Sequence, residues 1–302
     1  MKEKKKARKQ YKKIFRDAMN KELRENKTSF IVFNTLRLLI IFVFVRQLFN
    51  HSYETAFLCI LSIVLLYIPS WVQVRLHINL PPALEITIFC FIFATEILGE
   101  IDAFYIKIPM WDTILHTLNG FLAAGVGYSV VSLLNDDDRL TFDLSPLFLS
   151  LVAFCFSMTI GVLWEFFEFG MDLFFHLDMQ KDTVVNAIYS VALDPAKLNN
   201  VTAITGITEV TVNGQDLGLG GYLDLGIIDT MKDLFVNFIG AVVFSVIGFF
   251  YASTKGRRGG IVQSFTPTKK GEGNDYLKNG INAESGLSGG TGPAEKETAG
   301  RQ

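Results

Sequence analysis

The sequence predicts an all-α protein, a polytopic transmembrane helix bundle of about six spans with both termini in the cytoplasm. Half of its 302 residues are hydrophobic and 27 are phenylalanine, a composition typical of integral membrane proteins. Several apolar runs approach the roughly 20 residues that a helix needs to cross a bilayer. Both ends of the chain are basic, and positively charged flanks stay in the cytoplasm, so an even number of spans is expected. We therefore expect a multi-pass protein of the cell membrane.

The six predicted spans form a membrane domain over residues 29–253. The third span follows the pair Pro81-Pro82, which favours a helix start. The predicted spans are 30–49, 56–72, 84–98, 111–134, 147–175 and 226–252.

The two tails have different compositions. Residues 1–28 are basic, and hydrophobic side chains such as Tyr11 and Phe15 recur at helical spacing, which predicts an amphipathic helix that binds anionic lipid on the inner membrane surface. Nucleic-acid binding is the competing interpretation of a basic run, but the adjoining spanning helix disfavours it, and no nucleic-acid partner is expected. Residues 254–302 are rich in Gly, Ser, Thr, Lys and Glu, which predicts a disordered cytoplasmic tail.

The outer loop over residues 176–225 contains a hairpin signal. Alternating residues from Ile207 run into Asn213-Gly214, a pair that favours a tight β-turn. We expect a small β-hairpin that caps the outer face, with a disordered loop as the alternative.

Three carboxylates end the fifth predicted span. Glu165, Glu168 and Asp172 are spaced i, i+3, i+7 and so share one helical face. A carboxylate inside a spanning helix costs about 2.5–3.5 kcal/mol, so it usually faces a partner, a cavity or water. Either these acids form part of a polar site, or the helix has already left the membrane and they are hydrated.

Two other predicted spans begin with a polar face. Span four presents Asp112, His116 and Asn119 at helical spacing. Span six presents a similar series, although an Asp at a helix start can also act only as a cap. Its polar residues are Asp224, Asp229, Lys232, Asp233 and Asn237.

The predicted topology brings these three faces to the same membrane level, because spans four and six begin outside and span five ends outside. Closely packed carboxylates require bound protons or a cation, and oxygen ligands with one imidazole suit Mg²⁺ or Mn²⁺, with Zn²⁺ also compatible. The predicted ligands are His116, Glu165, Asp229 and Asp233. Glu168 is the predicted catalytic base and Asp112 its acid partner. The supporting residues are Asn119, Asp172, Asp224, Lys232 and Asn237. A proton-linked network and a purely structural network are the alternatives.

These motifs resemble a family of bacterial multi-pass membrane proteins of unknown function typified by YjdF, with a looser similarity to VanZ-like membrane proteins. The resemblance rests on Trp-Asp-x-x-x-His-x-x-x-Gly at Trp111–Gly120, on Glu-x-x-Glu at Glu165–Glu168, and on the spaced acids of Asp224–Gly240. It covers roughly spans three to six and implies a small polytopic membrane protein, without implying an activity.

Three function classes fit the polar site. The first is a metal-dependent enzyme that acts on a lipid or lipid-linked substrate, because no Ser or Cys nucleophile arrangement lies nearby. The second is a proton- or cation-coupled transporter, although no inverted repeat is visible. The third is a non-catalytic membrane scaffold.

Overall fold

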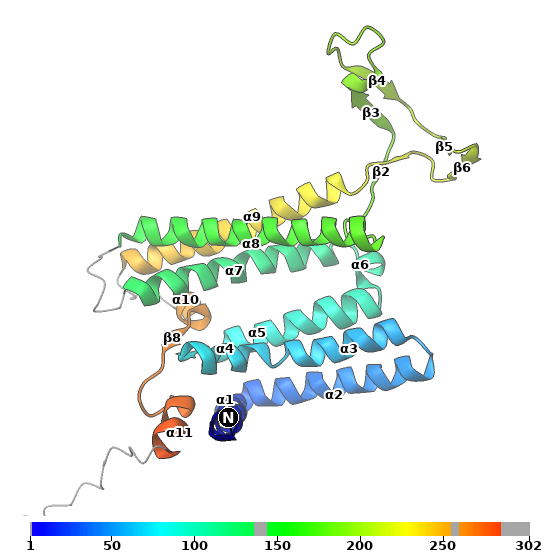
Figure 1. The fold of residues 1–302 in the computed structure, drawn as a ribbon. Helices are drawn as coiled ribbons and strands as arrows, with labels where there is room; N and C mark the ends of the chain where they lie inside the picture. The colour runs from blue at the N-terminus through cyan, green and yellow to red at the C-terminus, as the bar shows by residue number, and fades with distance from the viewer. Residues whose placement is uncertain (1, 136–143, 255–259, 285–302) are drawn as a thin grey trace, which may run out of the picture. The chain divides into compact units, whose positions relative to one another are not determined.

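The computed structural model describes residues 2–135, 144–254 and 260–284, and it is mainly helical (Figure 1). Within these residues, five helical stretches are long and apolar enough to cross a membrane. They are Lys27–Phe49, Tyr53–Leu76, Trp111–Leu133, Pro146–Phe175 and Ile227–Ser253. The prediction of a helical polytopic bundle is confirmed.

The chain divides into two compact units. The first comprises Met1–Ile101 and Pro267–Gln302, and the second comprises Asp102–Thr266. The candidate polar site lies entirely within the second unit.

The first unit begins with the basic helix α1 (Lys2–Glu25) and continues with α2 (Lys27–Phe49), α3 (Tyr53–Leu65) and α4 (Ile68–Leu76). Asn26 separates α1 from α2, because its side-chain oxygen accepts hydrogen bonds from the backbone N–H groups of Thr28 and Ser29, both at 3.0 Å. The core of this unit is apolar and is formed by Phe33, Ile40, Cys59, Leu66, Phe89 and Ile97 with their neighbours.

The third predicted span is helical throughout but divided. It consists of the 11-residue helix α5 (Pro82–Ile92) followed directly by η1 (Phe93–Ile101), a π-helix of nine residues. The hydroxyl of Thr95 donates to the carbonyls of Phe91 and Ile92, both at 3.1 Å, and such back-bonding accompanies local changes of helical geometry. This run is not one of the five stretches that are long and apolar enough to cross a membrane, although its residues are helical.

The tail differs from the predicted disorder. In the first unit, α11 (Tyr276–Glu284) packs on α1, where Leu277 contacts Ala18 and Val74, and β8 (Thr268–Lys269) pairs with β1 (Ile78–Asn79). Lys270 also forms a buried ion pair with Glu22. These contacts order residues 268–284, which were predicted to be disordered, and residues 255–259 and 285–302 of the predicted tail lie outside the described part of the chain.

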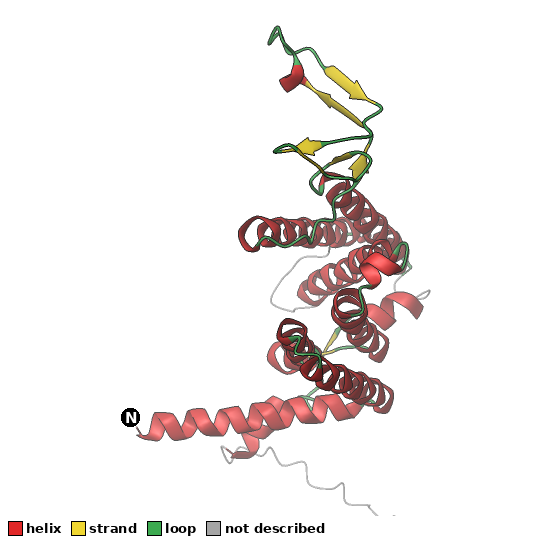
Figure 2. Cartoon of the chain, turned by 90° about the vertical axis from the view of Figure 1, so that its right-hand side faces the viewer, coloured by secondary structure: helices red, strands yellow, loops and turns green. Residues whose placement is uncertain are grey.

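The second unit is organised around three long helices that lie side by side (Figures 1 and 2). They are α7 (Trp111–Asn135), α8 (Pro146–Phe175) and α9 (Ile227–Ser253), preceded by the short α6 (Phe104–Lys107) and followed by α10 (Gly260–Phe265). Away from the polar site, an apolar cluster fills the bundle with Ala124, Tyr128, Leu149, Ala153, Phe244 and Val262.

Two glycines set the separation of α7 and α9. A Cβ atom at Gly120 would lie 2.1 Å from the carbonyl oxygen of Asn237, and one at Gly240 would lie 2.0 Å from that of Thr117. Only residues without a side chain permit this backbone approach, which is the usual role of small residues between membrane helices.

Short antiparallel strand pairs follow α8 and precede α9 (Figure 2). β2 (Val184–Val185) pairs with β7 (Tyr222–Leu223), and β3 (Ala187–Ser190) pairs with β4 (Thr202–Thr205) on either side of a 3₁₀ turn at Val191–Leu193. The predicted hairpin is present as β5 (Thr211–Val212) paired with β6 (Gln215–Asp216). Its turn residues Asn213 and Gly214 have φ angles of 55° and 81°, as a type I′ turn requires.

Candidate functional site

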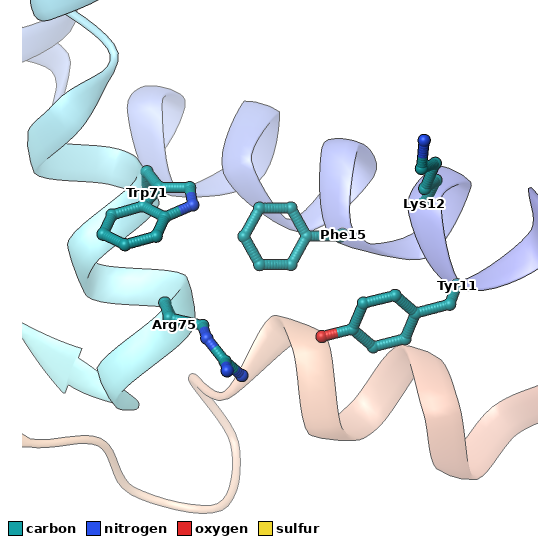
Figure 3. Close-up of a pocket in the computed structure, with 5 residues that line it drawn as sticks. All are labelled: Tyr11, Lys12, Phe15, Trp71 and Arg75. Carbon is teal, nitrogen blue, oxygen red and sulfur yellow. The ribbon is translucent and has the colours of Figure 1, made fainter. Parts of the chain in front are cut away.

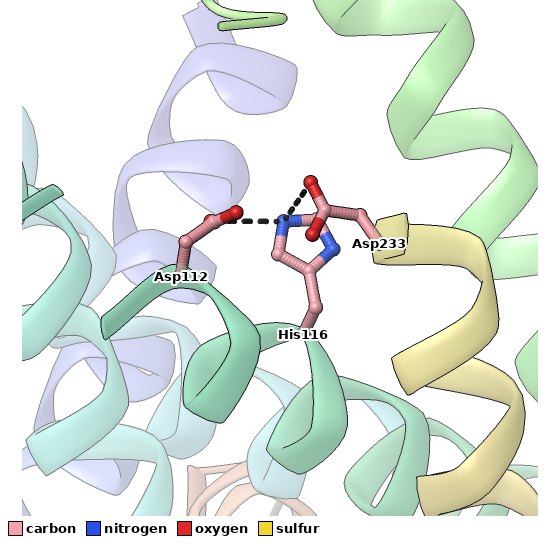
Figure 4. Close-up of side chains that lie close together, drawn as sticks. All are labelled: Asp112, His116 and Asp233. Atoms are coloured by element: carbon pink, nitrogen blue, oxygen red, sulfur yellow. Dashed lines mark ion pairs between the residues drawn. The ribbon is translucent and has the colours of Figure 1, made fainter. Parts of the chain in front are cut away.

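Asp112, His116 and Asp233 form a compact group between two helices (Figure 4). Nε2 of His116 lies 3.4 Å from Oδ1 of Asp112 and 3.8 Å from Oδ2 of Asp233. One candidate ligand atom from each residue lies within 4.8 Å of the others. The i, i+4 spacing places the first two on one face of α7, and α9 supplies the third.

A layer of polar contacts holds α7, α8 and α9 together next to this group. Nδ2 of Asn119 donates to Oδ1 of Asn237 at 3.4 Å, and Nδ2 of Asn237 lies 3.5 Å from the carbonyl oxygen of Ser157. The hydroxyl of Ser157 donates to the carbonyl of Gly120 at 2.7 Å. Asn119 and Asn237 therefore position the helices that carry the group and are not members of it.

The three side chains are buried to different depths. Asp233 is only 2% exposed, whereas the side chains of His116 and Asp112 are 12% and 25% exposed. Oδ1 of Asp233 is buried and has no hydrogen-bond partner within the described residues. An unsatisfied buried carboxylate oxygen carries its full desolvation cost, and a bound cation would remove that cost.

Lys232 connects this group to Asp229. Its Nζ lies 3.9 Å from Oδ2 of Asp112 and 3.6 Å from Oδ1 of Asp229. Asp229 also accepts a hydrogen bond from the backbone N–H of Lys181 at 3.0 Å. Asp229, predicted as a ligand, is therefore engaged by a lysine and a loop amide and lies outside the three-residue group.

Glu165 and Glu168 approach from α8 and are both buried. Oε1 of Glu168 accepts a hydrogen bond from the indole N–H of Trp164 at 2.7 Å, whereas Oε2 of Glu165 has no hydrogen-bond partner within the described residues. Each glutamate lies close enough to His116 for a charge–charge interaction. The structure thus brings both beside the three-residue group, without placing either carboxylate within it.

Asp172 and Asp224 stabilise the loop ends. Oδ1 and Oδ2 of Asp172 accept the backbone N–H groups of Met179 at 2.6 Å and Gln180 at 2.8 Å. The carboxylate of Asp224 accepts hydrogen bonds from the backbone N–H groups of Thr183 and Ile228, both at 2.7 Å. Burial opposes ionisation of Asp224, but these backbone hydrogen bonds outweigh it, so its pKa lies below the usual value.

Gln180 is a site-adjacent residue that sequence reasoning did not single out. Its Nε2 donates to Oγ1 of Thr230 at 2.5 Å, and its side chain also lies beside the Glu165 carboxyl. A glutamine in a loop has no periodic neighbours that would indicate such a position. The segment from Met179 to Lys181 therefore joins the ends of α8 and α9 at the polar site.

A family model described as "Predicted membrane protein (DUF2238)" matches residues 32–254, a range that includes α8, α9 and all the residues of the candidate site. The chain belongs to this family. The match confirms the resemblance to the YjdF-type proteins and the multi-pass membrane location, whereas the similarity to VanZ-like proteins stays a prediction. The family is one of unknown function. No curated protein and no solved structure matches the chain.

Proposed function

We propose that Asp112, His116 and Asp233 bind one divalent metal ion, and that the protein is a membrane-embedded enzyme acting on a lipid or lipid-linked substrate. The observation that carries this proposal is the convergence of two carboxylates on one imidazole, with a buried Asp233 oxygen that has no hydrogen-bond partner within the described residues.

The spacing suits a metal after small side-chain movements. Metal–ligand bonds of about 2.0–2.2 Å separate neighbouring ligand atoms by about 3–3.6 Å, and the two distances from His116 Nε2 are 3.4 and 3.8 Å. Two carboxylates and one imidazole are compatible with Mg²⁺, Mn²⁺ or Zn²⁺. Three protein ligands leave at least one coordination position for water or substrate, as catalytic sites require.

The same geometry changes three of the predicted roles. Asp112, predicted as an acid partner, would be a ligand, and Glu165 and Asp229, predicted as ligands, would lie beside the metal without binding it. Glu168 keeps the role of base, because it is buried beside the group and its Trp164 hydrogen bond orients the carboxylate. In a hydrolysis, Glu168 would take a proton from the attacking water and pass it to the leaving group as the substrate bond breaks, and a divalent metal held by Asp112, His116 and Asp233 would supply positive charge beside the substrate.

The surface next to Glu168 supports a substrate that enters from the bilayer. Trp164, one turn before Glu168 on α8, and Phe167 are exposed, and their ring centroids lie 5.3 Å apart. A pair of exposed aromatic side chains beside a buried carboxylate is a suitable surface for lipid or for a lipid-linked substrate.

The test is the lipid composition of cells that produce the full chain, compared by untargeted mass spectrometry with cells that produce Glu168→Gln. The matched control is Glu209→Gln, which removes a carboxylate in the outer segment, outside α7, α8 and α9. We expect one lipid class to be depleted by the wild type and by the control but not by Glu168→Gln, because loss of a general base slows turnover by about 10²–10⁴-fold. Identical lipid profiles in all strains would contradict the enzyme proposal.

A proton- or cation-coupled transporter is the second candidate, favoured by the unpartnered Oε2 of Glu165, which could carry a proton. The apolar cluster around Phe244 speaks against a proton path along these three helices, because the buried polar side chains next to its members in the chain, Ser129, Ser150 and Ser245, do not titrate. Ion flux through proteoliposomes, lost in Glu165→Gln and kept in Glu209→Gln, would favour the transporter. The third class, a membrane scaffold, predicts that Glu168→Gln leaves the lipid composition unchanged and that Glu165→Gln leaves the ion flux unchanged.

A further inference from the structure

A groove lies between α1 and α4 in the first unit, far along the sequence from the polar site (Figure 3). It has a volume of about 340 Å³ and is lined by Tyr11, Lys12, Phe15, Trp71 and Arg75.

The lining combines aromatic and cationic side chains. Phe15 lies between Trp71 and Tyr11, and the two cations Lys12 and Arg75 lie on opposite sides of this aromatic row (Figure 3). Trp71 is 48% exposed and Tyr11 is 42% exposed. Half-exposed Trp and Tyr side chains are typical of the head-group level of a membrane.

The position along the chain agrees with that level. Trp71 and Arg75 lie near the end of the apolar stretch Tyr53–Leu76, and Arg75 is in the last turn of α4. The other wall is the basic helix α1, whose sequence predicts contact with the inner membrane surface. Anionic phospholipids supply the negative potential of that surface.

Both cations are available to a ligand. Neither Lys12 nor Arg75 forms an ion pair with a carboxylate among the described residues. Two acids of α1 are engaged elsewhere, because Asp17 lies 4.0 Å from Arg16 and Glu22 pairs with Lys270. The groove therefore has an excess of positive charge beside an apolar floor.

We propose that this groove binds one anionic phospholipid, independently of the site on α7, α8 and α9. The guanidinium of Arg75 would bind the phosphate, because its planar donors match phosphate oxygens. Lys12, on a flexible stem, would approach the head group from the other side, and the acyl chains would cover Phe15 and Trp71. Such a lipid would fasten α1 to the end of α4.

The test is native mass spectrometry of the full-length protein released from nanodiscs that contain equal amounts of phosphatidylglycerol and phosphatidylcholine. The groove variant is Lys12→Gln/Arg75→Gln. The control is Lys9→Gln/Lys13→Gln, which removes the same charge from exposed positions outside the groove lining. A single basic group near anionic lipid changes binding about fivefold. We therefore expect the groove variant to lose roughly 20–30-fold in phosphatidylglycerol preference, with little change in the control.

Three further results decide the proposal. Arg75→Lys keeps the charge but loses the planar donors, so we expect its lipid preference to lie below that of the wild type and above that of the double variant, and no preference at all in this variant would overturn the proposal. Equal losses in both double variants would overturn the proposal, because they would indicate diffuse attraction to α1. Displacement of phosphatidylglycerol by millimolar inorganic phosphate would also overturn it, because the groove would then be a site for free phosphate.

Discussion

Substituting Gly240 by alanine should separate the two helices that carry the candidate metal site. The added Cβ would lie 2.0 Å from the carbonyl oxygen of Thr117 and 2.8 Å from the backbone nitrogen of Phe121. Both atoms belong to the backbone of α7, so no rotamer change relieves the overlap. Ordinary contact distances are about 3.5 Å, and α7 and α9 must therefore move apart by about 1 Å or more.

The energetic cost follows from this overlap. Overpacking a helix interface costs about 1–3 kcal/mol, and the rigid backbone places Gly240→Ala at the upper end. The better helix propensity of alanine returns about 1 kcal/mol, so the expected net loss is about 2 kcal/mol. For a chain of this size, that loss lowers the Tm by about 3 °C.

Gly170→Ala in α8 is the matched control, because a Cβ there meets nothing within 4 Å. It should raise the free energy of unfolding by about 0.5–1 kcal/mol through helix propensity alone. Thermal unfolding of both variants in the same detergent measures the difference. A Gly240→Ala protein as stable as Gly170→Ala, with unchanged metal binding, would refute the close-packing argument.

Three further predictions concern other parts of the chain. Lys270→Met leaves Glu22 as an unpaired buried charge and should lower the free energy of unfolding by about 3–5 kcal/mol. Limited proteolysis after residue 267 should therefore be faster in this variant, whereas Glu22→Met/Lys270→Met should restore resistance to the protease. The folded protein lowers the pKa of Asp224, so this carboxylate stabilises the fold above its unfolded pKa of about 3.9, and the stabilisation is lost as pH falls through the lower folded pKa. Hydrogen exchange of the Ile228 amide should rise in that pH window. An unchanged exchange rate would contradict the role of Asp224 as acceptor of this amide. Gly214→Val forces a β-branched residue to a φ of 81° and should speed amide hydrogen exchange in β5 and β6. Amide exchange as slow as in the wild type would show that the turn tolerates the side chain.

Sequence periodicity predicted the helices well because each span is a long apolar run, and the thickness of the bilayer sets its length. It could not predict the junction of α5 with η1, where the hydroxyl of Thr95 donates to two carbonyls. It also missed α10 and α11, because a few apolar contacts of Val262 and Leu277 order segments whose composition resembles a disordered tail.

The candidate site was partly predictable for a similar reason. Helical spacing placed Asp112 and His116 on one face, but spacing within a helix does not say which residue of another helix lies opposite. The backbone contacts of Gly120 and Gly240 bring Asp233 to His116. Asp172 and Asp224 have the same residue type and similar spacing, yet they bind loop amides.

The most direct test of the central proposal is the metal content of the detergent-purified full-length protein, measured by elemental analysis. Wild type would be compared with His116→Ala, Asp233→Asn and the control Glu209→Gln, with similar Tm values confirming that each variant is folded. We predict one divalent metal ion per chain in the wild type and the control, and its loss in both site variants. Folded wild-type protein that binds no Mg²⁺, Mn²⁺ or Zn²⁺ when each is supplied, or binds it equally in all four proteins, would contradict the metal site.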